Sequence, residues 1–193
     1  MDKQRKTILL HICCAPCAIW LVDFFQEEDF KVIGFFYNPN IHGEREYRAR
    51  FRDAETLAKK LNFDLEVPEY NVEDYFSAIY RFEKQHHRKI EGNSKLRCPV
   101  CYNLRLEQSA QYAKKIKADY FSTSLLISPY QRQSIIWQIG TDLGKKYGVP
   151  FYFRDWRKNY WESTHRAKKL NFYLPKYCGC VYSLKEKKNK QKL

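Results

Sequence analysis

The stretch Thr7-Ile-Leu-Leu-His-Ile-Cys-Cys-Ala-Pro-Cys17 decides the fold. Its first half, Thr7–Ile12, is an apolar run of the length of a buried strand, and Ala18–Glu27 follows it with the composition of a helix. A second apolar run, Lys31–Tyr37, comes next and is stopped by Asn38-Pro-Asn40. A strand, a helix and a strand in this order predict a βαβ unit with parallel strands.

The same alternation continues along the chain. Further helices are expected over Tyr47–Leu61, Val72–Lys84, Leu104–Ile116 and Gln131–Tyr147, further strands over Phe63–Val67, Tyr120–Leu126 and Phe151–Phe153, and a polar loop over residues 86–95. The 193 residues contain no internal repeat and no linker. We therefore predict an α/β fold, a parallel sheet with flanking helices, in a single domain over residues 1–183. The basic tail 184–193 is expected to be flexible.

The charge of the chain points to an anionic partner. Lys and Arg number 35 against 22 Asp and Glu, which gives a net charge of +13, and the chain has 15 Tyr and 13 Phe. Basic charge combined with many aromatic rings favours nucleic acid. The alternative is a lysine-rich surface of the kind that heat-adapted proteins carry.

The N-terminus resembles a signal peptide only weakly. Basic residues precede the apolar run, but His11 and Pro16 interrupt it, and residues 8–22 are too few and too polar to cross a bilayer. We expect a cytoplasmic protein without membrane contact. In that reducing compartment, clustered cysteines bind metals or react, and seldom form structural disulfides.

The seven cysteines fall into three clusters. These are Cys13-Cys14-Ala-Pro-Cys17, Cys98-Pro-Val-Cys101 and Cys178-Gly-Cys180. Clustered thiolates gather around soft metals, iron–sulfur clusters or redox centres. The first cluster follows the first strand directly, and ligands of parallel sheets bind at the carboxyl ends of the strands. The topology therefore predicts that the three clusters meet at one edge of the sheet.

Four of these sulfurs could hold one centre. Cys98 and Cys101 have the spacing of a ligand pair, and a turn between a strand and a helix lets Cys13 and Cys14 both face forward. We favour one [4Fe-4S] cluster on these four residues; the rival assignment divides Cys13 and Cys14 between two centres. A single zinc ion would leave three cysteines unexplained, yet a zinc-containing RNA-binding module stays an alternative.

The remaining cysteines suit a second task. Gly179 gives the backbone the freedom to bring Cys178 and Cys180 together as a redox-active dithiol or a strained, easily reduced disulfide. Alternatively, these two cysteines hold a second metal, a mononuclear iron, together with Cys17. A hairpin turn with inert cysteines is the third reading.

Three further features lie near strand ends. His11 could hydrogen-bond a cluster sulfur or donate a proton, although a buried histidine with satisfied nitrogens explains it equally well. Asp155 could donate a proton or bind a metal, or it could cap a helix or pair with Arg154 or Arg157. The turn Ser128-Pro-Tyr-Gln131 follows the fourth expected strand.

Taken together, these motifs resemble a known family. The segments are His11-Ile-Cys-Cys-Ala-Pro-Cys17, Cys98-Pro-Val-Cys-Tyr-Asn-Leu-Arg-Leu106, Phe121-Ser-Thr-Ser-Leu-Leu-Ile-Ser-Pro-Tyr-Gln131, Phe153-Arg-Asp-Trp-Arg-Lys158 and Tyr177-Cys-Gly-Cys180. They resemble the cobalamin-independent epoxyqueuosine reductases, the QueH family, over nearly the whole chain. The resemblance implies a PP-loop-like (HUP-like) fold, a [4Fe-4S] cluster on Cys13, Cys14, Cys98 and Cys101, and a redox or second-metal role for Cys178 and Cys180. It also implies a tRNA partner with a queuosine-type anticodon loop, in which epoxyqueuosine at the wobble position is reduced to queuosine, the last step of that modification.

The chemistry agrees with this resemblance. Converting an epoxide to an alkene takes two electrons and two protons and releases water, so an external electron donor and a two-electron centre near the cluster are expected. A neighbouring class, the ATP-dependent tRNA thiolation enzymes, uses a glycine-rich phosphate loop after the first strand. Here residues 13–17 contain no glycine, which argues against that class.

Overall fold

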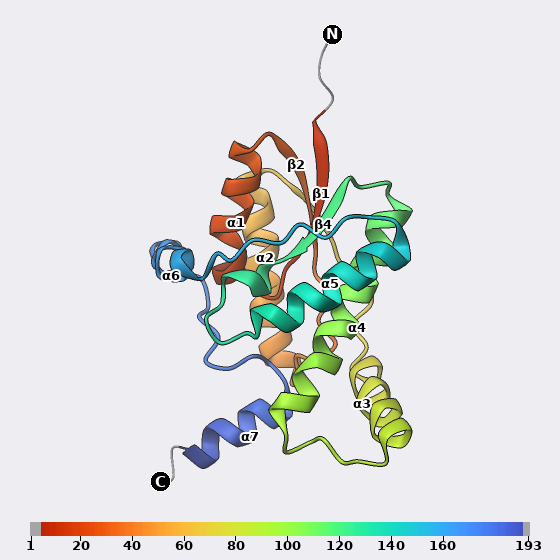
Figure 1. Cartoon of the computed structure of the whole chain (residues 1–193). Coiled ribbons are helices and arrows are strands. Elements are labelled where there is room, and N and C mark those ends of the chain that lie inside the picture. Colours follow the sequence, from red (N-terminus) through yellow and green to blue (C-terminus); the bar gives the residue numbers. More distant parts are fainter. Residues whose placement is uncertain (1–4, 191–193) are drawn as a thin grey trace.

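The computed structural model of the chain describes residues 5–190, and of Lys190 only the backbone (Figure 1). Its four strands are β1 (Lys6–His11), β2 (Phe30–Phe35), β3 (Asp64–Glu66) and β4 (Tyr120–Thr123). The helices are α1 (Ala15–Glu27), α2 (Glu44–Leu61), α3 (Glu73–His86), α4 (Ser94–Lys115), α5 (Gln133–Tyr147), α6 (Tyr160–Lys169) and α7 (Val181–Lys190), with 3-10 turns η1 (Ser124–Ile127) and η2 (Arg157–Asn159). The predicted α/β alternation is confirmed.

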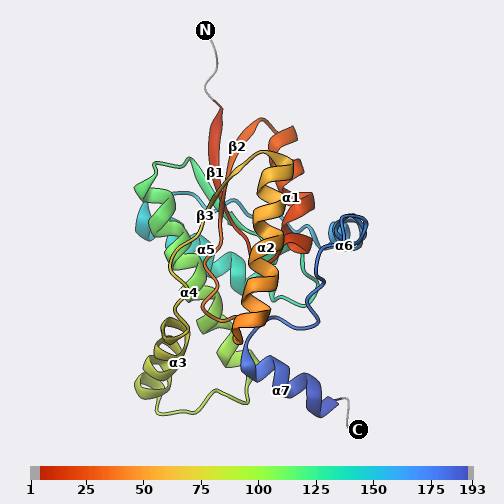
Figure 2. The ribbon, with the colours of Figure 1, turned by 180° about the vertical axis from the view of Figure 1, so that it is seen from behind.

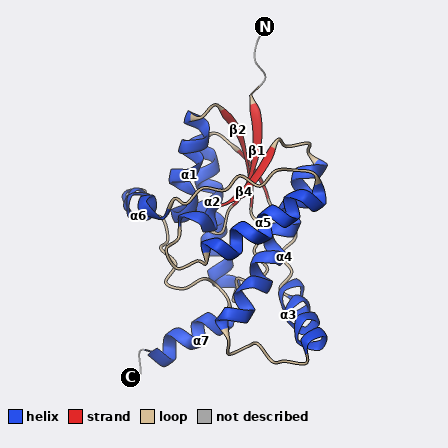
Figure 3. Ribbon diagram, viewed as in Figure 1, coloured by secondary structure: helices blue, strands red, loops and turns tan. Residues whose placement is uncertain are grey.

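The sheet has the order β3-β2-β1-β4, and every pairing is parallel. Helices α1 and α2 lie on one side of the strands, and α4 and α5 lie on the other (Figures 1–3). Strand β1 is central and its residues Ile8–Leu10 are fully buried, as expected for a strand covered on both faces. Because β1 and β4 end side by side, with His11 paired to Thr123, the residues after them share one edge.

The fifth expected strand, Phe151–Phe153, is wrong. Phe151 makes one isolated parallel bridge to Phe121, and the chain then leaves the sheet. The carbonyl of Tyr152 accepts a hydrogen bond from the Ser122 hydroxyl (2.9 Å), so a side chain takes the place of a further ladder bond. The strand expected over Tyr120–Leu126 is also shorter. It ends at Thr123, whose hydroxyl accepts a hydrogen bond from the amide of Leu125 (3.2 Å) and starts η1.

Helix α4 begins ten residues earlier than expected, so the predicted loop over residues 86–95 is in part helical. Asn93 caps it by accepting a hydrogen bond from the amide of Lys95 (3.0 Å). Pro99 lies inside the helix and has no N–H to offer the carbonyl of Lys95. Arg132 donates to that carbonyl instead (2.9 Å), which compensates the helix for the proline.

The basic tail also differs from expectation where it is described. Helix α7 contains residues 184–190, which we expected to be flexible, while residues 191–193 lie outside the described part. Glu186 of this helix pairs with Arg97 of α4 (2.8 Å), which joins the two elements. Within residues 5–190, no helix combines the length and the apolar character needed to cross a bilayer.

Candidate metal centre

All seven cysteines line one cavity of about 700 Å³. The turn between β1 and α1 contributes three of them, α4 contributes two, and the segment that enters α7 contributes the last two. Convergence of the three clusters at one edge of the sheet is thus confirmed. Cys98 and Cys101 were expected to precede a helix; they lie within its first two turns, three positions apart and therefore on one face.

The first cluster is compact. The sulfurs of Cys13, Cys14 and Cys17 all lie within 4.8 Å of one another, and those of Cys13 and Cys14 are 3.7 Å apart. The reason is local: Cys14 is extended at the helix N-cap (φ −171°), and Pro16 lies in the first turn of the helix that begins at Ala15. The structure therefore groups Cys17 with Cys13 and Cys14, while one of the alternatives given above makes Cys17 a metal ligand together with the C-terminal pair.

Ser124 holds Cys13 from the end of β4. Its hydroxyl donates to the Cys13 sulfur (3.3 Å) and accepts from the Cys13 amide (3.0 Å). Hydrogen bonds from the thiols of Cys14 and Cys17, together with Ser124, hold the pKa of Cys13 well below its usual value. The hydrogen bond to Cys13 raises the pKa of Cys14, and the hydrogen bonds to Cys13 and Cys14 raise the pKa of Cys17. Burial raises the pKa of Cys98, and it raises that of Cys101 to about 11.

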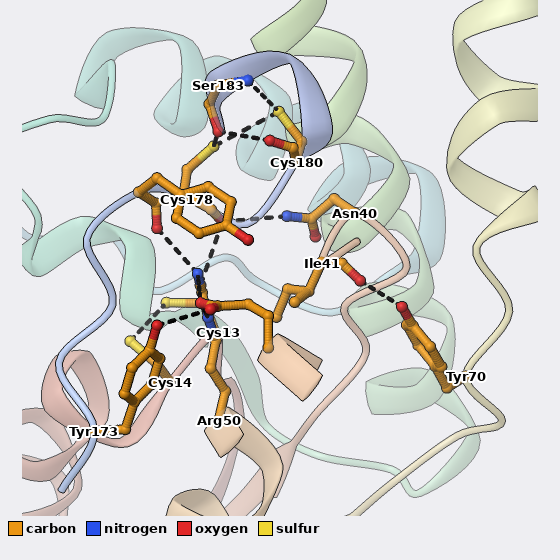
Figure 4. A network of polar contacts seen from close by, with 12 residues as sticks. Cys13, Cys14, Asn40, Ile41, Arg50, Tyr70, Tyr173, Cys178, Cys180 and Ser183 are labelled. Carbon is orange, nitrogen blue, oxygen red and sulfur yellow. Dashed lines mark hydrogen bonds and ion pairs between the residues drawn. The ribbon is translucent and has the colours of Figure 1, made fainter. Parts of the chain in front are cut away.

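The C-terminal pair is a dithiol in this structure. The thiol of Cys178 donates to the sulfur of Cys180 at 3.8 Å (Figure 4), far beyond the disulfide bond length of about 2.05 Å. Cys180 precedes the first turn of α7, and the amide of Ser183 donates to its sulfur (3.3 Å). The hydrogen bond from Cys178 and those from Ser183 lower the pKa of Cys180 to about 5. Residues 5–190 contain every cysteine of the chain and form no disulfide.

Backbone contacts fix this pair over the cavity. Arg50 of α2 donates to the carbonyl of Cys178 (3.3 Å; Figure 4) and to that of Tyr177 (3.0 Å). Gly179 has a φ of +113°, and a Cβ there would come within 2.9 Å of Ile41. Glycine is therefore required between the two cysteines, as the sequence indicated.

Three buried arginines line the same cavity and were not predicted. Arg50, Arg97 and Arg105 are 3%, 1% and 4% exposed. Glu46 neutralises Arg50 (2.6 Å) and Glu186 neutralises Arg97. Among the described residues, no carboxylate lies within 4.0 Å of the Arg105 guanidinium.

The buried charge of Arg105 indicates that the cavity can hold an anionic group. A buried cation is costly without a countercharge, and the groups near Arg105 that can become anionic are the thiols of Cys101, Cys13 and Cys178 and the phenol of Tyr102. A [4Fe-4S] cluster is held by four deprotonated cysteines, and seven cysteines surround this cavity. The donor set and the buried cation both fit such an anionic group.

Two other predicted site residues, Asp155 and His11, have contacts of their own. Asp155 does not line the cavity; it pairs with Arg157 (2.5 Å), which lowers the pKa of the carboxyl group. His11 is fully buried, with Nε2 against the Tyr37 carbonyl (3.1 Å) and Nδ1 against the Thr123 hydroxyl (3.0 Å). Burial lowers its pKa to about 4, so the ring is neutral and both nitrogens have partners.

Known proteins that are similar in sequence to this chain share one family description. The sequence model of a family described as "Epoxyqueuosine reductase QueH" matches residues 8–186. The epoxyqueuosine reductase QueH of Dehalococcoides mccartyi is 37% identical over 177 residues, which are 91% of each chain. That of Thermotoga maritima is 35% identical over 189 residues, 95% of this chain and 93% of the relative.

Solved structures share the fold at low sequence identity. A predicted subunit of tRNA methyltransferase from Methanocaldococcus jannaschii has a TM-score of 0.54 at 12% identity, covering 84% of this chain and 76% of its own. The U34-tRNA thiolase NcsA from Methanococcus maripaludis, solved with its [4Fe-4S] cluster, has a TM-score of 0.57 at 14% identity. It covers 94% of this chain and 62% of its own. These likenesses confirm the predicted PP-loop-like fold.

Proposed function

Since the chain belongs to the epoxyqueuosine reductase QueH family, we propose that it is the oxidoreductase that reduces epoxyqueuosine in tRNA to queuosine in the cytoplasm. The observation that carries the proposal is the convergence of all seven cysteines on one cavity that also holds a buried, unneutralised arginine. Neither the zinc-containing RNA-binding module nor the ATP-dependent thiolation enzyme is retained, because membership of a reductase family favours neither.

We assign the [4Fe-4S] cluster to Cys13, Cys14, Cys98 and Cys101. When bound, it supplies electrons one at a time from an external donor. The protein's part is to hold the thiolates and to balance their charge. The Ser124 hydroxyl stabilises the Cys13 thiolate through its hydrogen bond. The guanidinium of Arg105, which among the described residues has no carboxylate within 4.0 Å, supplies positive charge.

Cys178 and Cys180 are assigned the two-electron step. Opening the epoxide and forming the alkene consumes two electrons and two protons, and the oxygen leaves as water. A dithiol can give two electrons by closing a disulfide, and the sulfurs of this pair already face each other at 3.8 Å. The low pKa of Cys180 keeps it as the thiolate that this closure needs.

A second candidate assignment gives the same pair a mononuclear iron, with Cys17 as a third ligand. One distance favours it. Ligand sulfurs about 2.3 Å from a tetrahedral metal are about 3.8 Å apart. The Cys178 and Cys180 sulfurs have this separation. Such an ion would act as a Lewis acid on the epoxide oxygen.

The test is anaerobic purification followed by two measurements. Iron and acid-labile sulfide should approach four of each per chain for the cluster alone, with further iron but no further sulfide if the second site is filled. With a chemical reductant, the loaded protein should convert epoxyqueuosine-containing tRNA to queuosine-containing tRNA. Zinc without iron or sulfide would overturn the cluster, and tRNA left unchanged by fully loaded protein would overturn the reductase.

A further inference from the structure

Two aromatic rings that line the cavity form a row with a third ring beside them. Tyr130, in the turn after η1, and Tyr160, at the start of α6, both line the cavity, and their ring centroids are 5.9 Å apart. Trp161 continues the row, 5.2 Å from Tyr160. Tyr130 is 74% exposed and Trp161 is 71% exposed. Large rings with so little cover have most of their surface free for a partner.

The aromatic row is held in place by contacts deeper in the protein. Ser163 of α6 donates to the carbonyl of Pro16 (2.7 Å) at the start of α1, next to Cys17. On the other side, the Tyr102 hydroxyl donates to Gln131 (2.8 Å), the neighbour of Tyr130. Both ends of the row are thus tied to the elements that carry the cysteines, so the rings are positioned before any partner arrives.

Two lysines also line the cavity. Lys176 is exposed and Lys187 is partly exposed, and within the described residues neither has a carboxylate within 4.0 Å. Rings with free faces beside cations without partners match the two surfaces of single-stranded RNA, its bases and its phosphates. The net charge of +13 favours RNA over a protein partner.

We propose that the aromatic row stacks the bases that flank the target nucleotide of the substrate RNA, while Lys176 and Lys187 bind its phosphates; the proposal rests on the function assigned above. A cavity of about 700 Å³ has the size of a site for one nucleoside. To enter it, the target base must leave the anticodon stack, and its former neighbours lose a stacking partner. Tyr130 and Trp161 replace that partner at the point where the base enters.

Binding of a labelled anticodon stem-loop RNA to the cluster-loaded protein tests the row. Tyr130→Ala and Trp161→Ala should each weaken binding on the order of tenfold, the effect of losing one stacked base. The slope of log affinity against log salt should stay the same, because stacking releases no counterions. The slope is negative, and Lys176→Ala and Lys187→Ala should each reduce its magnitude by about 0.7, the value for one phosphate of a single strand.

The chain supplies matched controls. Tyr80 of α3 is 62% exposed and Trp137 of α5 is 48% exposed, and neither belongs to the aromatic row. Tyr80→Ala and Trp137→Ala should leave the affinity unchanged. A stem-loop that lacks the two bases flanking the wobble nucleotide provides the partner half of a double-mutant cycle. With this RNA, Tyr130→Ala and Trp161→Ala should cost little further affinity.

The outcomes separate this inference from the proposed reductase. If wild-type protein binds the RNA and reduces epoxyqueuosine-containing tRNA while both aromatic variants bind as wild type, the row is not a stacking site and the reductase assignment stands. Equal losses on intact RNA and on RNA without the flanking bases would also overturn the row. If the wild type binds no RNA and acts on the free nucleoside alone, both the row and the tRNA substrate are overturned.

Discussion

The Nε atom of Arg105 donates a hydrogen bond to the carbonyl of Cys101, one turn earlier on α4, at 3.3 Å. This hydrogen bond connects the guanidinium to the backbone of Cys101, a candidate cluster ligand. Arg105 is 4% exposed and has no carboxylate within 4.0 Å among residues 5–190, so the ionisable groups beside its charge are the thiols of the cavity and the phenol of Tyr102. The protein keeps a cation where only an anionic group makes it favourable.

Replacing Arg105 should therefore have opposite effects on the metal-free and the loaded protein. Arg105→Met removes an uncompensated buried charge, so the metal-free protein should melt at the same temperature or a few degrees higher, at about 2–4 °C per kcal/mol for a chain of this size. The rise in melting temperature on loading should shrink. Arg105→Lys, which keeps the charge, should retain most of that rise. Equal destabilisation of both forms by Arg105→Met would show that the side chain serves packing alone.

Substitution of the α4 cysteines tests the ligand set. Cys98→Ser and Cys101→Ser should each abolish the brown absorption, the acid-labile sulfide and the activity together. Cys17→Ser is the control within the first cluster and should keep the sulfide content of the wild type. Loss of the cluster in Cys17→Ser, with retention in Cys14→Ser, would exchange these two residues in the assignment.

Cys180→Ala should separate the cluster from turnover. If the C-terminal pair delivers electrons or holds a second metal, this variant should keep the cluster absorption and lose conversion of epoxyqueuosine. Cys178→Ala should behave alike, because each residue needs its partner. Absorption spectra and single-turnover conversion are the measurements, and a colourless Cys180→Ala protein would make Cys180 a cluster ligand.

The glycine between these cysteines gives a paired comparison. Gly148 and Gly179 both have a positive φ, +73° and +113°, but only a Cβ at Gly179 meets another residue, Ile41. Both alanine substitutions should destabilise the fold by about 1–3 kcal/mol through backbone strain. Gly179→Ala should in addition displace the cysteine pair and lower turnover. Equal kcat values for the two variants would remove the geometric requirement at position 179.

Asp155→Asn should leave the reaction intact, since Asp155 pairs with Arg157 outside the cavity. Arg157 lowers the folded-state pKa of Asp155, so the pair stabilises the fold above the unfolded pKa, and this contribution is lost as the pH falls through the folded pKa. The carboxyl group is largely solvated, so the stability difference at neutral pH should be small and should vanish in acid. A marked drop in kcat, with a shifted pH profile, would restore Asp155 as a proton donor.

Features of the fold that depend on short stretches of sequence could be predicted from the sequence alone. The apolar run before Cys13 and the helix after Cys17 were sufficient for the βαβ unit and for the edge where the cysteines meet. The start of α4 was missed because Pro99 argues against a helix interior, and the residue that compensates for it, Arg132, lies far along the chain. Arg105 gave no signal either. A basic residue inside an amphipathic helix resembles a surface residue until the fold shows that it is buried.

The order of the cysteines along the chain has a consequence for biosynthesis. Translation yields the first cluster with the first strand, and it yields Cys178 and Cys180 after every strand of the sheet. The sheet can therefore form before the C-terminal segment is synthesised, and at that stage this segment does not cover Cys13, Cys14 and Cys17. Helix α7 and the dithiol are synthesised last. Until they cover the cavity, the thiols of the nascent protein are accessible to iron, and equally to oxygen or a competing metal.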